Sequence, residues 1–292
     1  MRFNIGDATV DVVLDLECFA LPVPRFMPAA DLSELQAQRA LLEPDHVDFD
    51  GNALLIGMQA MLLRIPGLTI LVDTCVGEDK PRPAHPSWNQ RRASGFLERL
   101  AELGVGPEDV DVVFCTHLHA DHIGWNTRLL NGRWVPTFPR ARYLVGRREL
   151  EYWQSRALAE PGIGHGSFAD SVQPLLEAGL VVTVEDGEEL APGITLQPLP
   201  GHSPGQMGLH VRRGGEQALF LGDAIHSPVQ VFRPEWSSAL CTDPDQARTT
   251  RRQILECAAE ENVLLVPAHF RNCGCARIRR EGDGFTPLFG PG

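Results

Sequence analysis

The chain reads His117-Leu118-His119-Ala120-Asp121-His122 directly after an apolar stretch, residues 110–116. This run places four potential metal ligands within six residues. Imidazole and carboxylate groups suit zinc, iron, manganese or cobalt, and a short turn after a strand can aim all four side chains inward. A histidine-rich surface loop would not need the apolar strand before it, so we interpret the run as part of a metal site.

The spacing within the run predicts two metals rather than one. Side chains two positions apart at a strand end point the same way, so His117 and His119 can share one metal. The chain then turns, and Asp121 and His122 leave the turn in another direction, where they suit a second metal. Two adjacent metals are typical of hydrolases, because they stabilise both the attacking and the leaving oxygen.

Three more ligand-capable residues, His202, Asp223 and His269, stand at the ends of apolar runs. These runs are residues 194–199, 218–222 and 263–268. Polar residues at the C-terminal ends of strands are where a layered sheet opens onto a site. We therefore expect these three side chains to complete the metal site.

The pattern resembles the metallo-β-lactamase superfamily. Its HxHxDH signature is matched by His117, His119, Asp121 and His122, and its later ligands by His202, Asp223 and His269. The segment 71–74 resembles the early strand-end motif of that family, in which the aspartate, here Asp73, is structural rather than a ligand. The resemblance covers about residues 50 to 270.

The resemblance implies a mixed α/β (α+β) fold, a four-layer αββα sandwich with a binuclear site at one edge of its two sheets. By the family pattern, one metal is held by His117, His119 and His202, and the other by Asp121, His122 and His269, with Asp223 bridging the two. Two divalent ions, by default zinc, are the implied cofactors. A hydroxide between them, with its pKa lowered to about 7, is the implied nucleophile.

Composition favours one soluble domain over residues 1–292. The hydrophobic content of 43% supports a packed core, and no linker divides the chain. A formal charge of −12 argues against a nucleic-acid partner. The N-terminus lacks the apolar core of a signal peptide, no run reaches membrane-spanning length, and the seven cysteines do not form a disulfide framework. We therefore expect a reduced, cytoplasmic protein that does not bind membranes.

Hydrophobic periodicity predicts alternating strands and helices. Strands and hairpins are expected over 4–17 and 53–73, and a short strand over 142–145. The expected helices are residues 89–103, 147–154, 169–178 and 244–260, the last with Asp243 as its N-cap. The arginine doublets at 91–92, 147–148 and 251–252 are expected on solvated helix faces.

Within the superfamily, the residues favour one group. Metallo-β-lactamases proper lack the bridging carboxylate that Asp223 would supply, and little chain follows His269 for the glutathione-binding helices of glyoxalase II. The remaining group comprises N-acyl homoserine lactonases, related lactonases and organophosphate hydrolases of the methyl parathion hydrolase type. We therefore predict a metal-dependent hydrolase that opens a small-molecule lactone or ester; the alternative is an organophosphate triester or aryl ester hydrolase using the same metals.

Residues 18–50 form an apolar N-terminal extension. Its segment 19–28 is stiffened by prolines, and three interpretations stay open: a hydrophobic wall over the site, a surface that docks on a second subunit of a homodimer, or core packing. For the aromatic residues Trp125, Tyr152 and Trp153, core packing is favoured over a place in the pocket.

Two residues are candidates for proton transfer. The resemblance implies that Asp121, or His226, passes a proton to the leaving oxygen. His226 stands three residues after Asp223, where many acyl homoserine lactonases have a tyrosine that donates a hydrogen bond to the substrate. A histidine there can donate similarly, and a purely structural role stays open. His46, His85, His165 and His210 show no partner pattern and are expected to be structural or exposed.

Overall fold

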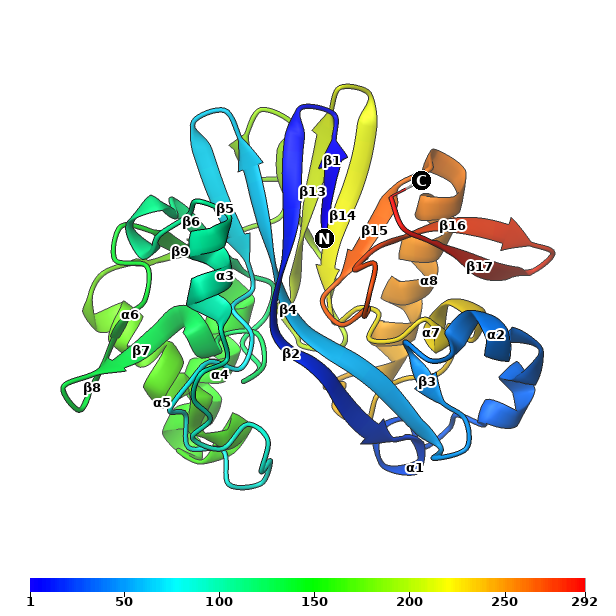
Figure 1. Cartoon of the computed structure of the whole chain (residues 1–292), viewed down its shortest axis with the longest axis horizontal. Coiled ribbons are helices and arrows are strands. Elements are labelled where there is room, and N and C mark those ends of the chain that lie inside the picture. Colours follow the sequence, from blue (N-terminus) through cyan, green and yellow to red (C-terminus); the bar gives the residue numbers. More distant parts are fainter. Residues whose placement is uncertain (292) are drawn as a thin grey trace.

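Two long antiparallel strands, β2 and β4, run through the centre of the computed structural model, which describes residues 1–291 (Figure 1). They belong to the first of two large sheets. Its strands, in order, are β1 (Arg2–Ile5), β2 (Ala8–Pro22), β4 (Ala53–Ile65), β5 (Leu68–Val72), β6 (Val112–Cys115), β9 (Arg142–Gly146) and β10 (Val181–Val184), and β3 (Val47–Asp48) pairs with β4. The strands from β5 to β10 in this order run parallel to one another.

The second sheet packs against the first. Its strands, in order, are β11 (Glu189–Ala191), β12 (Ile194–Pro198), β13 (Met207–Arg213), β14 (Glu216–Gly222), β15 (Leu264–Pro267), β16 (Ala276–Glu281) and β17 (Gly284–Phe289). Only β14 and β15 run parallel among these neighbours. A separate hairpin is formed by β7 (Thr127–Leu130) and β8 (Arg133–Pro136).

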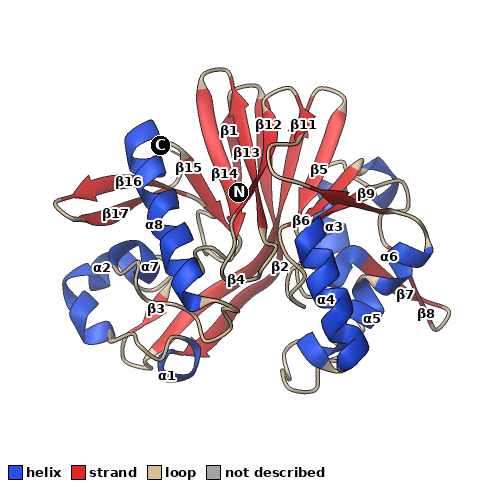
Figure 2. Ribbon diagram, turned by 180° about the vertical axis from the view of Figure 1, so that it is seen from behind, coloured by secondary structure: helices blue, strands red, loops and turns tan. Residues whose placement is uncertain are grey.

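Helices cover the outer faces of both sheets. The α-helices of the structure are α1 (Val23–Phe26), α2 (Arg39–Leu42), α3 (Phe96–Glu102), α4 (Arg147–Ala159), α5 (Ser167–Ser171), α6 (Gln173–Glu177), α7 (Val229–Phe232) and α8 (Pro244–Glu261). In Figure 2, α3 to α6 lie beside the first sheet and α8 lies beside the second. The predicted αββα sandwich is therefore confirmed. Among residues 1–291, no helix is long and apolar enough to cross a membrane.

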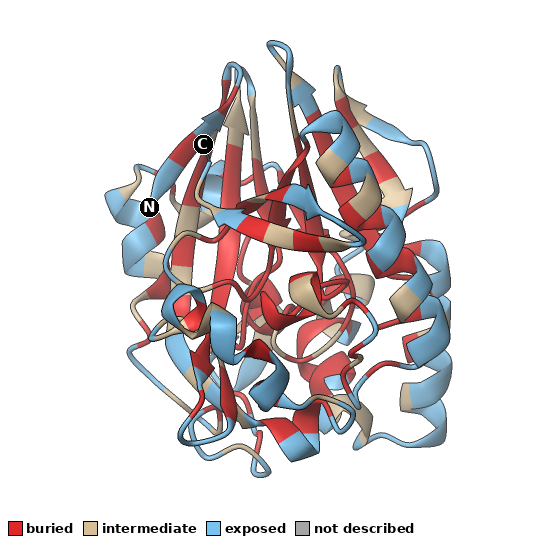
Figure 3. Cartoon of the chain, turned by 90° about the vertical axis from the view of Figure 1, so that its right-hand side faces the viewer, coloured by how far each residue is buried: buried red, intermediate tan, exposed pale blue. Residues whose placement is uncertain are grey.

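The core has an inner layer between the sheets and an outer layer under the helices on each side. In β4, Met58 and Leu62 pack toward the helices, whereas Met61 and Leu63 pack between the sheets. Because both faces of β4 are buried, its sequence is almost continuously apolar rather than alternating. Figure 3 shows the same pattern, with buried residues in the strands and exposed residues on the outer surfaces of the helices.

The strand order positions the site. Parallel strands end at the same edge of a sheet, so the residues that follow β5 and β6 emerge together, as do those that follow β14 and β15. The first of these are Asp73, Thr116, Asp223 and Ala268. The predicted ligand loops therefore leave the two packed sheets close to one another.

Two predicted helices differ in the structure. The helix expected over 89–103 spans only Phe96–Glu102, because Gln90, Ala93 and Gly95 adopt positive φ, which a helix does not tolerate. The helix expected over 169–178 is divided into α5 and α6 at Val172, whose φ is −120°. Pro174 has no N–H for the Asp170 carbonyl, which instead accepts from Lys80 Nζ at 3.2 Å and from the Thr127 hydroxyl.

The longest predicted helix is confirmed as α8. The Asp243 side chain accepts a hydrogen bond from Gln246 N at 2.9 Å, as expected of an N-cap. The prediction that the arginine doublets lie on solvated helix faces is wrong for Arg251 and Arg91. Arg251 is fully buried and donates to the Ala224, Pro234 and Trp236 carbonyls, and Arg91 lies in a loop, where it donates to Asp15.

Candidate metal centre

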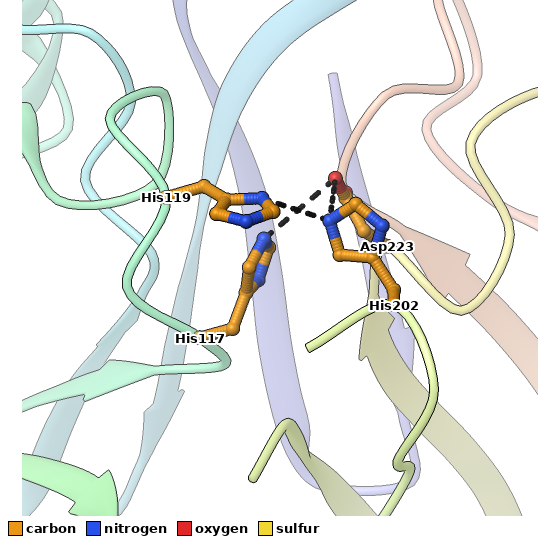
Figure 4. Close-up of side chains that lie close together, drawn as sticks. All are labelled: His117, His119, His202 and Asp223. Atoms are coloured by element: carbon orange, nitrogen blue, oxygen red, sulfur yellow. Dashed lines mark hydrogen bonds and ion pairs between the residues drawn. The ribbon is translucent and has the colours of Figure 1, made fainter. Parts of the chain in front are cut away.

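The structure brings all seven predicted ligands together at the edge of the two sheets. One group contains four residues, His117, His119, His202 and Asp223, and a second contains Asp121, His122 and His269. Within each group, one ligand atom per residue lies within 4.8 Å of the others. Figure 4 shows the first group, with His117 and His119 on one loop facing His202 and Asp223 from the second sheet.

In the first group, the ligand atoms converge from two sides. The His119 Nδ1 and His202 Nε2 atoms are 2.8 Å apart. The Asp223 Oδ2 atom lies 3.3 Å from His202 Nε2 and 3.7 Å from His117 Nε2. Four nitrogen and oxygen atoms thus surround one point.

Asp223 also faces the second group, with its other oxygen. Its Oδ1 atom lies 3.0 Å from His269 Nε2 and 3.3 Å from His122 Nε2. The Asp121 Oδ2 atom lies 3.7 Å from His269 Nε2 and 3.8 Å from His122 Nε2. One carboxylate therefore presents one oxygen to each group, as a bridging ligand does.

Buried polar atoms without hydrogen-bond partners indicate, independently of any family resemblance, that these residues fit two divalent ions. His117 Nε2, His122 Nε2 and Asp223 Oδ1 are buried atoms with no hydrogen-bond partner. Leaving such an atom unsatisfied costs about 1–3 kcal/mol, and bound cations would satisfy all three. The donor set is imidazole nitrogen and carboxylate oxygen, which suits zinc, manganese, iron or cobalt.

The histidines of the first group are neutral. Burial lowers the pKa of His119 to about 4 and holds the pKa values of His117 and His202 well below the ordinary value. Burial has this effect because it disfavours the charged imidazolium. Neutral imidazole is the form that binds metals, so these three side chains are ready to act as ligands.

In the second group, nearby carboxylates determine the direction in which the histidine pKa values shift. Burial opposes a charge on His122 and His269, but the nearby carboxylates, Asp223 first, outweigh it and raise both pKa values. Burial would also raise the pKa of Asp223, yet His269, His122 and His226 together hold that pKa well below its usual range. A site whose carboxylates draw protons onto histidines is one that favours cations.

Outer contacts orient the ligand rings. The carboxylate of Asp73, at the end of β5, lies 2.8 Å from His122 Nδ1 and accepts from Thr116 N at 2.8 Å. His269 Nδ1 lies 2.8 Å from the Gly57 carbonyl oxygen, and His117 Nδ1 lies 3.1 Å from Thr116 Oγ1. Such contacts fix the ring orientation and the nitrogen that faces the metal. The sequence gives no signal for Gly57, because its contribution is a backbone carbonyl.

Glu149, near the start of α4, is a residue that sequence reasoning missed. Its buried carboxylate accepts from Leu118 N and Gly205 N, both at 3.0 Å, from Ser203 Oγ at 2.6 Å and from Trp153 Nε1 at 2.8 Å. These bonds join the loop of His117 to the loop of His202. Burial raises the pKa of Glu149. In the sequence, Glu149 looks like any glutamate in a first helical turn.

The structure places His226 inside the centre. Its Nε2 atom lies 3.2 Å from Asp223 Oδ2, and its ring centroid lies 4.6 Å from that of His202. Both ring nitrogens are buried without hydrogen-bond partners. The Gln230 side chain accepts from the His226 backbone N–H at 2.7 Å, which holds this turn. His226 is therefore close enough to act on a molecule bound at the centre.

The N-terminal extension reaches the same place. The Phe26 ring packs edge-on against His226, with 5.3 Å between centroids. Phe26 also belongs to a buried cluster with Met27, Leu35 and Trp236. The segment thus combines core packing with a contact on the site.

The three aromatic candidates differ in position. Trp125 stacks on Phe96 in the core, with 5.5 Å between centroids, as expected. The ring of Trp153 is buried but packs against the ligand His119 at 5.3 Å, so Trp153 borders the centre. Tyr152, beside it, is partly buried on the same core cluster.

An aromatic cluster near Asp121 was also missed. It consists of Phe19, His85, Trp88 and His165, with His85 packed on Trp88 at 4.5 Å and on His165 at 4.8 Å. Burial lowers the pKa of His85 and of His165, and the charge of Asp121 partly counters it for both. The charge of Asp121 therefore reaches both imidazole rings of the cluster.

Comparison with known proteins agrees with the geometry. The family model described as Metallo-beta-lactamase superfamily matches residues 57–269. The protein named N-acyl homoserine lactonase AiiB from Agrobacterium fabrum is 25% identical over 264 residues, which cover 85% of this chain and 92% of that protein.

Solved structures share the fold. The dizinc quorum-quenching lactonase AidC, in complex with a product, superposes with a TM-score of 0.78 at 20% identity, covering 100% of this chain and 97% of that one. The hydrolase AbOPH of the beta lactamase superfamily superposes with a TM-score of 0.81 at 20% identity, covering 98% and 96%. These likenesses extend over nearly the whole of each chain.

Proposed function

Because this chain belongs to the metallo-β-lactamase superfamily, we propose that it is a metal-dependent hydrolase that opens lactones or esters, with N-acyl homoserine lactones as its substrate class. The observation that carries the proposal is the position of Asp223, which presents one oxygen to each ligand group. A bridging carboxylate is the ligand that metallo-β-lactamases proper lack. The similarity to AiiB over most of both chains supports the same substrate class.

We propose the following roles for the ligands. One ion would be held by His117, His119 and His202, the other by Asp121, His122 and His269, with Asp223 shared between them. When bound, the two ions supply a water activated as nucleophile at neutral pH and a Lewis acid for the carbonyl oxygen. Zinc is the expected metal, as the dizinc neighbour AidC suggests.

Side chains would supply the proton transfer, the hydrogen bond to the substrate and the exclusion of water. The Asp121 carboxylate, whose Oδ2 faces His122 and His269, would hold a proton on its other oxygen and pass it to the leaving oxygen. The His226 ring, whose Nε2 atom has no hydrogen-bond partner, would donate a hydrogen bond to the substrate carbonyl or the leaving oxygen. Phe26 and Trp153 border the centre on two sides and would limit access of water.

The aromatic cluster favours a second candidate function. An organophosphate triesterase or aryl esterase would use the same ions with an aryl leaving group. Phe19, Trp88, His85 and His165, whose two imidazole rings the charge of Asp121 reaches, offer ring faces to such a group.

We also propose one domain over residues 1–292, with 18–50 as an extension beside the active site, and a reduced, cytoplasmic location. The contact of Phe26 with His226 supports the placement of the extension, and the seven free cysteines support the reducing compartment. A homodimer through the extension is tested by light scattering of wild type and of Phe26→Ala.

The experiment that tests the function is proton release from a medium-chain N-acyl homoserine lactone, with metal-loaded and chelated protein compared. Ring opening that disappears on chelation is the expected result. If protein that holds two metals per chain released no proton, the lactone assignment would be wrong and aryl esters and triesters would be tested next.

A variant tests the bridging role. Asp223→Ala is expected to abolish turnover and to lower the metal content toward one ion per chain, with Asp186→Ala as control because Asp186 is exposed in a turn and belongs to neither candidate ligand group. An Asp223→Ala protein that kept two metals and full activity would remove this aspartate from the site.

A further inference from the structure

A cavity lies between α8 and the outer face of the second sheet. Its volume is about 400 Å³. The sheet contributes His210 and Leu219, and α8 contributes Thr250, Gln253 and Ile254. Figure 2 shows α8 lying along this sheet. The cavity is therefore a groove beside a helix, and none of its lining residues belongs to the candidate ligand groups.

His210 is the polar group that this groove leaves without a partner. Its neighbours on β13, Leu209 and Val211, point into the core between the sheets, so His210 points outward to α8. The side chain is only 6% exposed, and its Nε2 atom is buried with no hydrogen-bond partner. Buried polar groups normally have partners, so a hydrogen-bonding molecule in the groove would satisfy this nitrogen.

The lining selects a neutral occupant. No lining residue has a formally charged side chain, and burial lowers the pKa of His210, which keeps its ring neutral. Most of the remaining lining is apolar, including Leu199, Leu219 and Leu265. A hydroxyl group can donate or accept and therefore suits either tautomer of the imidazole. A charged group would lose its hydration without gaining an opposite charge.

The groove adjoins the segment that carries a metal ligand. Leu199 and Pro200 line it, and His202 follows two residues later. Thr250 Oγ1 donates to the Pro200 carbonyl at 2.7 Å. A Cβ atom on Gly201 would lie 2.2 Å from the Ala247 backbone nitrogen, so α8 packs tightly on this segment. An occupant would thus touch the chain just before His202.

We propose that this groove is a second small-molecule site, which binds a neutral molecule with an apolar body and one hydroxyl group bonded to His210 Nε2. The site does not depend on the proposed hydrolase function. It uses no metal ligand and no residue assigned to catalysis.

The test uses the metal-loaded full-length protein and two probes that differ only in the hydroxyl, p-cresol and toluene. Chemical shifts of the His210 ring and of the Leu199, Leu219 and Ile254 methyl groups are followed by NMR titration. We expect saturable shifts confined to these groups and about fivefold weaker binding of toluene, the size of one net hydrogen bond. Equal affinities, shifts at the metal-ligand histidines instead, or no saturable shift would overturn the proposal.

Two variants sharpen the test. His210→Phe is expected to remove the preference for p-cresol over toluene, with metal content unchanged. Ile254→Trp should fill the groove and abolish binding of both probes, with Leu158→Trp as control because Leu158 is 81% exposed on α4. If Ile254→Trp bound p-cresol as tightly as wild type, the groove would not be the site; His210→Gln repeats the first measurement should the phenylalanine variant fold poorly.

Discussion

Asp73 shows how one carboxylate can serve a metal centre without being a ligand. It lies in the left-handed region, with φ of 58°, and its oxygens contact Thr116 and His122 Nδ1. Each of its hydrogen bonds therefore holds a ligand loop in place. The negative charge of Asp73 also contributes to the raised pKa of His122.

We expect Asp73→Asn to weaken metal binding by the Asp121, His122 and His269 group about 10–100-fold, the usual effect of losing such a contact. An amide cannot supply the negative charge that orients His122. Competition with a chromogenic chelator measures the affinity, and Asp186→Asn is the control. An unchanged affinity would show that Thr116 and the backbone alone position the ring.

The burial of His46 makes the stability of the protein depend on pH in the acid range. Its ring stacks on Phe289 at 4.8 Å, and burial lowers its pKa to about 4 from the ordinary value of 6.5. The folded state therefore resists protonation, whereas the unfolded state takes up a proton below pH 6.5. Above pH 6.5 His46 is neutral in both states and does not change the stability with pH. As the pH falls from 6.5 toward 4, protonation of the unfolded state progressively lowers the unfolding free energy.

His46→Phe should flatten that dependence. Between pH 6.5 and 5, wild type is expected to lose about 2 kcal/mol more unfolding free energy than the variant. Urea unfolding of both chelated proteins at the two pH values measures the difference, since all other titrating groups are shared. Parallel pH profiles would contradict the assignment.

At the scale of elements, the loop before α3 is anchored by buried charge rather than by its own structure. Arg82 makes two hydrogen bonds, of 2.7 and 2.8 Å, to Asp170 on α5, and Lys80 Nζ lies 3.5 Å from the same carboxylate. Burial lowers the pKa of Lys80 to about 7. This anchor holds the loop that carries His85 and Trp88.

Asp170→Asn is expected to destabilise the protein by about 3–5 kcal/mol, because it leaves the buried guanidinium of Arg82 without its counter-charge. Urea unfolding gives the value. The control is Asp79→Asn, whose partner Arg92 is 80% exposed, and it should cost about 0–1 kcal/mol. A loss for Asp170→Asn no larger than for the control would mean that the network does not anchor the loop.

Elements were predicted best where local signals agreed. For α8, the N-cap Asp243 and the apolar periodicity both belong to neighbouring residues, and the prediction held. The segment 89–103 had helical periodicity too, but Asn89 Oδ1 accepts from Arg82 N at 2.8 Å, and the chain turns there. Tertiary contacts overrode the local preference, which is only a weak prior.

At the scale of the whole molecule, two segments that are far apart in the sequence meet at the candidate metal centre. Phe26, from the N-terminal extension, packs on His226, which follows β14 of the second sheet. Nothing in the sequence indicates that these two residues contact each other. This contact supports the proposal that the extension lies beside the active site.

We expect Phe26→Ala to lower kcat/KM for long-chain lactones more than for short-chain ones, because the apolar wall next to His226 is lost. Leu32→Ala is the matched control: Leu32 lies in the same buried cluster, so its removal also creates a cavity. Rates over a series of acyl chain lengths provide the measurement. The same chain-length profile in both variants would reduce Phe26 to ordinary packing.

The sequence alone predicted which side chains could hold metals and that they follow buried strands, because ligand chemistry and strand periodicity are properties of neighbouring residues. It also determined the αββα class through the resemblance that those residues carry. Only the tertiary structure decided that Asp223 turns one oxygen to each group, that Gly57 and Glu149 hold the ligand loops, and that α8 leaves a groove beside His210. These features depend on backbone groups that every residue has, and on contacts between segments far apart in the chain.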